Sequence, residues 1–329
     1  MTAMTPEPGM DPDITLPDYR GGGLVNLMSS IATALGADSP YPPLTALPPE
    51  ALAGARHLVL LVIDGLGHDF LLGRDSALRR HLRSPLTSVF PSTTAAAIPT
   101  FLTGLAPQQH GLTGWHMYFR EIGAIAAPLP FRVRAGRHAL REAGVTPATL
   151  FGLTPLFDRL RLPSHVVSPR QIIHSDFNVA LSGRARRHGY ETLDEMFALI
   201  AGLLRVEAPR SYVHAYWPQL DNLAHEYGIH SPQVAEAFAA LDAGFAQLAE
   251  VARKPAAASS SPPTMDSSTR ARPSTSMTIP GCAKPCCCPC AASRAWPTPT
   301  FARAAKRSSR TTSAAIWQNG FTCSGAPMS

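Results

Sequence analysis

The feature that most restricts the fold is a nearly uninterrupted apolar segment, His57-Leu-Val-Leu-Leu-Val-Ile63, which ends abruptly at Asp64-Gly65. A run of this length that is rich in branched side chains is typical of a strand buried on both faces of a parallel sheet. Similar strand patterns at 86–90, 165–168 and 211–217 alternate with helical patterns. This alternation predicts an α/β fold with a doubly wound, mostly parallel sheet and flanking helices.

Helical periodicity is clearest in three segments. Residues 24–35 and 191–206 read as helices, and a longer helix is expected to open at Ser231-Pro232 and to end near Lys254. Serine is a favoured capping residue, and proline is favoured in a first helical turn. The apolar stripe of this last helix comprises Val234, Phe238, Leu241, Phe245, Leu248 and Val251.

These patterns divide the chain into parts. Residues 1–23 are rich in Pro, Asp and Gly and are expected to form a flexible arm, and residues 24–254 are expected to form the core. Within the core, the irregular segment 116–164, rich in Pro, Gly and Arg, reads as an inserted substrate-side region outside the sheet. Residues 255–329 differ from everything before them and are expected to be a low-order tail.

Charge and cysteine both change at residue 254. The net charge of +6 comes from the tail, which has eight basic residues and a single acid, Asp266, whereas the body is almost neutral. All six cysteines lie after residue 280, so no disulfide framework supports the body. The N-terminus has neither a basic start nor an apolar stretch of signal length. A cytoplasmic protein without a nucleic-acid or membrane partner is therefore expected.

Three side chains of types that bind metal ions, two carboxylates and one imidazole, lie directly after predicted strands. Asp64 closes the buried strand, and a carboxylate there can either bind a divalent cation or cap the next helix. Asp221 and His225 are four residues apart after the 211–217 strand, which places them on one face of a helical turn. Such a pair can bind zinc, although most pairs with this spacing belong to solvated helix faces.

The segment Ser92-Thr93-Thr94 lies between a strand-like run and a helix start rich in alanine. A hydroxyl and free backbone N–H groups would converge there, as at a phosphate site, or Ser92 or Thr93 would simply cap the helix. A threonine hydroxyl is a poor nucleophile unless a metal ion or a base activates it, so Thr94 needs a partner such as a metal held by Asp64.

Three motifs in this order are more specific than any one of them: VIDGLG, then SVFPSTTAAAIPTFLTGLAPQQHGLTGW, then YWPQLDNLAHEYG. Together they resemble the nucleotide pyrophosphatase/phosphodiesterase-like family of the alkaline phosphatase superfamily, over about residues 56–254. The resemblance implies that Asp64 binds one zinc ion, that Thr94 is the nucleophile bridging toward it, and that Asp221 and His225 bind a second zinc ion. Two zinc ions, or other divalent cations, would then assist an in-line phosphoryl transfer through a phosphothreonine.

The chain departs from the family pattern at Trp115. The nucleotide pyrophosphatases have an asparagine there that contacts the transferred phosphoryl group, so a nucleotide substrate is in doubt. A sulfatase is disfavoured because no Cys or Ser stands in a C/S-x-P-x-R pattern at the nucleophile position. His110, in Gln109-His110-Gly111, reads as a structural histidine.

The tail reads as a shifted reading frame. The family has a further Asp-His pair on a strand that ends in DHG, and a later His, but neither follows Lys254. A one-base shift of codons compatible with residues 263–269 gives Asp-His-Gly-Phe-Ile-Asp, and the shift stays productive over residues 276–300. We hypothesise a one-base frameshift near codon 254. The alternative is a real Cys-rich tail that binds metal through residues 286–290, but adjacent cysteines cannot all reach one tetrahedral ion.

The sequence thus predicts a metal-dependent hydrolase of small phosphate esters, of the phosphodiester or nucleotide pyrophosphate type, whose ligands after residue 254 are missing. The chain as written is expected to be inactive or nearly so. The alternatives are a non-catalytic remnant of this fold, and a phosphomonoester or phosphonate hydrolase of the same superfamily.

Overall fold

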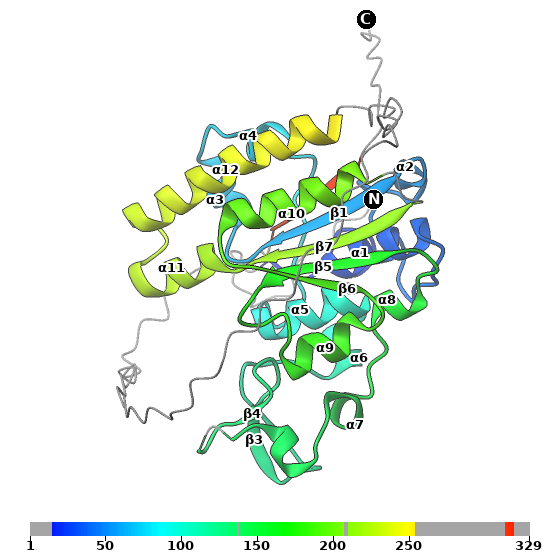
Figure 1. Ribbon diagram of the computed structural model, residues 1–329, viewed down its shortest axis with the longest axis vertical. Helices are drawn as coiled ribbons and strands as arrows, with labels where there is room; N and C mark the ends of the chain where they lie inside the picture. Colours follow the sequence, from blue (N-terminus) through cyan, green and yellow to red (C-terminus); the bar gives the residue numbers. More distant parts are fainter. Residues whose placement is uncertain (1–14, 137, 207–209, 254–312, 319–329) are drawn as a thin grey trace, which may run out of the picture. The chain divides into compact units, whose positions relative to one another are not determined.

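The computed structural model describes residues 15–136, 138–206, 210–253 and 313–318. Its main sheet has five strands in the order β6-β5-β7-β1-β8 (Figure 1). The first four are mutually parallel, and β8 pairs antiparallel with β1 at the edge. The strands are β1 (His57–Ile63), β5 (Ser164–Pro169), β6 (Arg186–Tyr190), β7 (Ser211–Trp217) and β8 (Ser313–Gln318). The predicted fold class, a mostly parallel α/β sheet, is confirmed.

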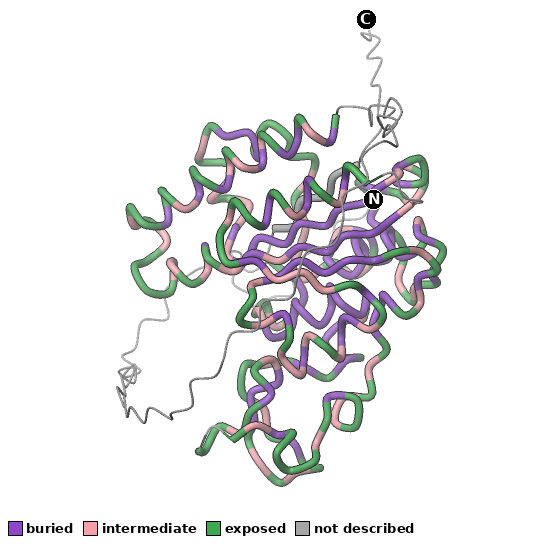
Figure 2. The backbone as a smooth tube through the Cα atoms, in the orientation of Figure 1, coloured by how far each residue is buried: buried purple, intermediate pink, exposed green. Residues whose placement is uncertain are grey.

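Side chains alternate across β1 and divide the core into two layers. Leu58, Leu60 and Val62 face a layer built with α1 (Leu24–Ala34), α5 (Thr94–Thr103), α8 (Leu156–Arg159) and α9 (Asp176–Ser182). The alternate residues of β1 face α10 (Leu193–Arg205) and α12 (Pro232–Arg253) on the opposite side. All seven residues of β1 are buried, as a strand covered on both faces requires (Figure 2).

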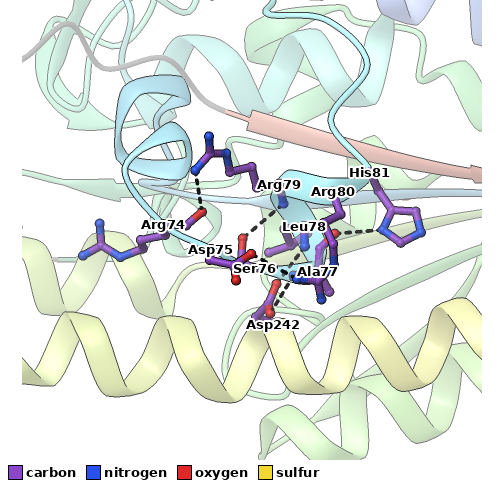
Figure 3. Close-up of polar contacts among 9 residues, drawn as sticks. All are labelled: Arg74, Asp75, Ser76, Ala77, Leu78, Arg79, Arg80, His81 and Asp242. Atoms are coloured by element: carbon purple, nitrogen blue, oxygen red, sulfur yellow. Dashed lines mark hydrogen bonds and ion pairs between the residues drawn. The ribbon is translucent and has the colours of Figure 1, made fainter.

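The helix α12 also holds the short helices that follow β1, namely α3 (His68–Leu72) and α4 (Ala77–Arg80). The Asp242 carboxylate of α12 accepts hydrogen bonds from the backbone N–H groups of Ala77 (2.9 Å) and Leu78 (2.8 Å), while Ser76 accepts one from Arg79 (Figure 3). The three N–H groups at the start of α4 therefore all have acceptors. A side chain 164 positions away in sequence fixes this short helix against α12.

Most predicted elements of the core are present within a residue or two. The apolar run 57–63 is β1, the runs at 165–168 and 211–217 lie in β5 and β7, and the three predicted helices are α1, α10 and α12. The cap of α12 is also confirmed, because Ser231 accepts a hydrogen bond from the Val234 N–H.

The predicted strand at 86–90 is wrong. Only Thr87 makes a bridge there, to Gly23, and Phe90 is 71% exposed. Pro85 and Pro91 flank the segment, and proline can neither donate to a ladder nor extend a central strand. Residues 86–90 therefore form an extended loop that bonds the backbone of residues 22–24 and does not join the main sheet.

The segment 116–164 forms a second sheet of three short antiparallel strands, in the order β2-β3-β4. Aromatic side chains join this segment to the layer below the main sheet, because the ring of Phe151 lies 5.9 Å from that of Phe131 and 6.4 Å from that of Phe177 in α9. The elements here are β2 (Met117–Phe119), β3 (Ala124–Ala127), β4 (Arg132–Val133), η1 (Leu140–Ala143) and α7 (Pro147–Phe151).

Two short helices complete the described elements, α2 (Glu50–Ala53) before β1 and α6 (Pro107–His110) after α5. Of the predicted tail 255–329, only β8 falls within the described residues, and it occupies the edge position beside β1. The frameshift hypothesis concerns residues 255–329, of which all but those of β8 lie outside the described residues, as do residues 1–14 of the predicted arm. No helix in the described parts of the chain is long and apolar enough to cross a membrane.

Candidate active site

The site begins where β1 ends. Asp64 follows the last residue of β1 and is held by a backbone hydrogen bond from its N–H to the Trp217 carbonyl at the end of β7 (3.0 Å). Its side chain is 6% exposed, yet it sits at the carboxyl edge of a parallel sheet, where α/β folds place ligands. A buried carboxylate needs donors, and both described donors to Oδ2 are hydroxyls.

The first of these donors is Thr94, the residue predicted as a nucleophile. Its Oγ1 donates to Asp64 Oδ2 at 3.1 Å, and Thr94 is the first residue of α5. Thr93 occupies the N-cap position, but its side chain makes no capping hydrogen bond. The capping alternative therefore does not account for this threonine-rich turn. The start of α5 presents the Thr94 hydroxyl next to a helix N-terminus, an arrangement suited to an anionic group.

The second donor is Tyr216, which sequence reasoning missed. Its hydroxyl lies 2.8 Å from Asp64 Oδ2. Burial raises the pKa of Asp64, and the Tyr216 hydrogen bond partly offsets this because it favours the charged carboxylate. Burial together with the Asp64 charge raises the pKa of Tyr216 well above its ordinary value, so its hydroxyl stays protonated and remains a donor. The alternation of β7 was the available signal, since it places Tyr212, His214 and Tyr216 on one face.

Asp221 and His225 lie on α11 (Gln219–Tyr227), directly after β7. His225 Nε2 lies 3.4 Å from Asp221 Oδ2, so the four-residue spacing does bring the pair together. The Asp221 charge also contributes to the raised pKa of Asp64, because the two carboxylates lie near each other.

Gly65 makes this approach possible. It has a φ of +79°, and a Cβ placed on it would lie 2.7 Å from both the N and Cα atoms of Asp221. A side chain at this position would meet the backbone of α11. The close contact between the loop after β1 and the first turn of α11 brings Asp64 and Asp221 into one site.

The donor types suit a divalent metal, but their number does not. The described residues supply Asp64 with Thr94 on one side and Asp221 with His225 on the other, whereas zinc sites use at least three protein ligands. Within the described part of the chain, no group of three or more His, Cys, Asp or Glu residues is arranged to hold a metal ion. The described residues therefore provide only two donors toward each zinc site implied by the resemblance, fewer than the three protein ligands that such a site uses.

His110 is placed as a structural residue. Its Nδ1 accepts from the Leu112 N–H at 3.0 Å, and its Nε2 lies 3.2 Å from the Ala96 carbonyl of α5. It is buried, and desolvation lowers its pKa to about 4, so it is neutral near pH 7. The ring joins the turn after α6 to the helix that carries Thr94.

The site motifs fall within residues 58–258, which match the family described as type I phosphodiesterase / nucleotide pyrophosphatase. The chain belongs to this family. No curated protein matches the chain. Among solved structures, it is similar to murine ectonucleotide pyrophosphatase/phosphodiesterase 5, with 18% identity over 60% of this chain and 52% of that chain and a TM-score of 0.44. It is also similar to phosphonoacetate hydrolase from Sinorhizobium meliloti, with 18% identity over 61% of this chain and 55% of that chain and a TM-score of 0.39. The chain thus spans about half the length of these structures.

Members of the type I phosphodiesterase family are typically metal-dependent. The structure has a cavity of about 270 Å³ beside Thr94. Thr94 and Tyr216, which both bond Asp64, line this cavity. Trp115, where the sequence departs from the family pattern, also lines it and is 50% exposed. The second sheet contributes Leu129, Pro130 and Arg132. Part of the segment 116–164 therefore does face the candidate site.

Proposed function

We propose that this chain represents a metal-dependent hydrolase of phosphate esters, of the phosphodiester or nucleotide pyrophosphate type, in which Thr94 is the nucleophile. The observation that supports this proposal most directly is the 3.1 Å hydrogen bond from Thr94 Oγ1 to the buried Asp64 carboxylate. It orients the hydroxyl at the carboxyl edge of the sheet, beside a helix N-terminus that favours phosphoryl oxygens.

In the proposed reaction, the Thr94 oxygen attacks phosphorus as the bond from phosphorus to the leaving oxygen breaks, which forms a phosphothreonine, and the leaving oxygen takes up a proton from water and departs as the alcohol. The hydroxyl proton is taken by Asp64, to which it already points and whose basicity burial increases. Water then hydrolyses the phosphothreonine and restores the Thr94 hydroxyl. Zinc or another divalent cation, when bound by a complete ligand set, would lower the pKa of the nucleophile and stabilise charge on the phosphoryl group.

The incomplete donor set supports a second part of the proposal, namely that the chain as written is inactive or nearly so. With two described donors per ion, each site would bind metal weakly. A phosphomonoester or phosphonate hydrolase of the same superfamily remains the alternative reaction, and Trp115 supports it against a nucleotide substrate.

The test compares the 329-residue chain with a version whose reading frame is restored after codon 254. The restored chain should hold close to two zinc ions and should hydrolyse a phosphodiester. Its Thr94→Ala variant should not hydrolyse the phosphodiester. The reaction classes are separated by comparing hydrolysis rates at equal metal concentration for a phosphodiester, bis(4-nitrophenyl) phosphate, a phosphomonoester, 4-nitrophenyl phosphate, and a phosphonate, phosphonoacetate. Mass spectrometry of acid-quenched enzyme should locate a phosphoryl group on Thr94. Full zinc-dependent turnover by the 329-residue chain would refute the proposed inactivity.

A further inference from the structure

The cavity beside Thr94 contains a polar group that no part of the proposed reaction uses. His214, in the middle of β7, lines the cavity and is 2% exposed. Neither of its ring nitrogens has a hydrogen-bond partner among the residues that the structure describes. Buried imidazoles almost always pair at least one nitrogen, because an unpaired buried polar group is destabilising.

Neighbouring rings fix the His214 side chain in place. The Phe101 ring of α5 lies 6.4 Å from it and the Phe157 ring of α8 lies 6.3 Å from it, the latter nearly perpendicular. The contacts are apolar, so they position the imidazole without satisfying it. Desolvation lowers the pKa of His214 to about 4, and near neutral pH it therefore offers one N–H donor and one nitrogen acceptor.

The lining of the cavity restricts what else can bind there. Most of the exposed wall is apolar and comes from residues such as Ile98, Leu102 and Val166. Among the described lining residues there is no Asp or Glu, and Arg132 is the single charged one. A cationic group would therefore be desolvated without a counter-charge, which disfavours amines and quaternary ammonium groups. The volume of about 270 Å³ exceeds that of a cavity of about 150 Å³, which already accommodates benzene.

We propose that this cavity binds the organic group of the substrate, an uncharged and largely apolar ring that carries one hydrogen-bonding substituent bound by His214. This assignment rests on the proposed function, because the orientation of the substrate follows from the role of Thr94, which lines the cavity together with Tyr216. The phosphoryl group would lie at Thr94 while the ring extends inward toward β7. His214 would then determine substrate specificity without touching the reacting atoms.

Binding of two phosphate-free probes to the full chain tests this assignment. Isothermal titration calorimetry should show that 4-methylphenol, which has a hydroxyl, binds about tenfold more tightly than toluene, which lacks it. In His214→Leu the difference between the two probes should disappear, while toluene affinity is kept. Leu102→Trp should abolish binding of both, because the indole fills the cavity.

The matched control is His165→Leu. His165 is also a buried histidine with a pKa of about 4, but it lies on β5 and bonds His188, and it is not part of the cavity lining. Its replacement should leave the affinity of both probes unchanged. If His214→Leu does not fold, His214→Phe provides the same comparison, and far-ultraviolet circular dichroism verifies the fold of each variant.

The outcomes separate this assignment from the proposed reaction. Equal affinity for the two probes, an unchanged preference in His214→Leu, or no binding of either probe would overturn the assignment of the cavity. Thr94→Ala should keep the preference for 4-methylphenol, because the probes contain no phosphorus. A chain that shows the probe preference but fails the phosphothreonine test, with its frame restored, would refute the proposed reaction and leave the cavity assignment intact.

Discussion

Replacement of Gly65 by alanine should break the contact that brings the two halves of the candidate site together. Gly65 has a φ of +79°, and its added Cβ would lie 2.7 Å from the backbone of Asp221, closer than van der Waals contact allows. A left-handed conformation costs a non-glycine residue about 1–2 kcal/mol. The clash adds about 1–3 kcal/mol, as overpacking does, because a backbone must move and not a flexible side chain. The free energy of unfolding should therefore fall by about 2–5 kcal/mol.

Gly36 supplies the control for this prediction. Its φ is +81°, almost the same as that of Gly65, but no atom lies within 4 Å of its added Cβ. Gly36→Ala should therefore cost only the conformational part, about 1–2 kcal/mol. The difference between the two variants measures the close approach of the β1–α3 loop to α11.

Urea unfolding followed by circular dichroism gives both free energies, with the same slope expected for each variant. Equal destabilisation by the two substitutions would show that the β1–α3 loop does not touch α11, and the juxtaposition of Asp64 and Asp221 would then lose its structural basis.

Three further outcomes follow from the described contacts. Asp242→Ala should lower the free energy of unfolding by about 2 kcal/mol, since it removes two of the three hydrogen bonds at the start of α4. Asp75→Ala should change the free energy of unfolding little, because the Asp75–Arg80 ion pair is exposed, and urea unfolding checks both variants. Stability should fall as the pH drops from about 6.5 toward 4, because the unfolded chain takes up a proton that His110, with its folded pKa of about 4, does not. This one group contributes about 3 kcal/mol. His110→Gln should therefore reduce the slope of the unfolding midpoint against pH in this range, while His165 and His214, whose pKa values are also lowered to about 4, keep part of it. Tyr216→Phe should raise the pKa of Asp64 further, because the Tyr216 hydroxyl stabilises the charged carboxylate. A carbon-13 NMR titration of the Asp64 carboxyl measures this pKa, and an unchanged or lowered value would contradict the prediction.

The buried strands could be predicted because their patterns are local. β1 and β7 are continuous apolar runs that end at turn or proline residues, and the stripe of α12 follows the 3.6-residue period. The strand β6 was missed, since its sequence RRHGY has no apolar pattern. It joins the sheet because it pairs with β5, a tertiary effect that local periodicity cannot reveal.

The candidate site shows the same division. Asp64, Thr94 and the Asp221–His225 pair could be placed at strand ends from sequence, and the structure brings Thr94 to Asp64 and His225 to Asp221. The partners Tyr216 and His214 depend on which way alternate residues of β7 face, and that requires knowing which layer covers each face. The close approach at Gly65 depends on the packing of two loops, which no short motif encodes.

The place of β1 in the sheet affects how the chain emerges from the ribosome. β1 is the first strand of the main sheet to be synthesised, but its parallel partner β7 follows it by 154 residues, as the register His57↔Ser211 shows. At 5–20 residues per second, synthesis of that interval takes roughly 8–30 s. During that time the segment HLVLLVI has no partner strand to pair with, and α12, which packs on one of its faces, is synthesised later still. This segment is therefore where chaperone binding, or aggregation in its absence, is expected to begin.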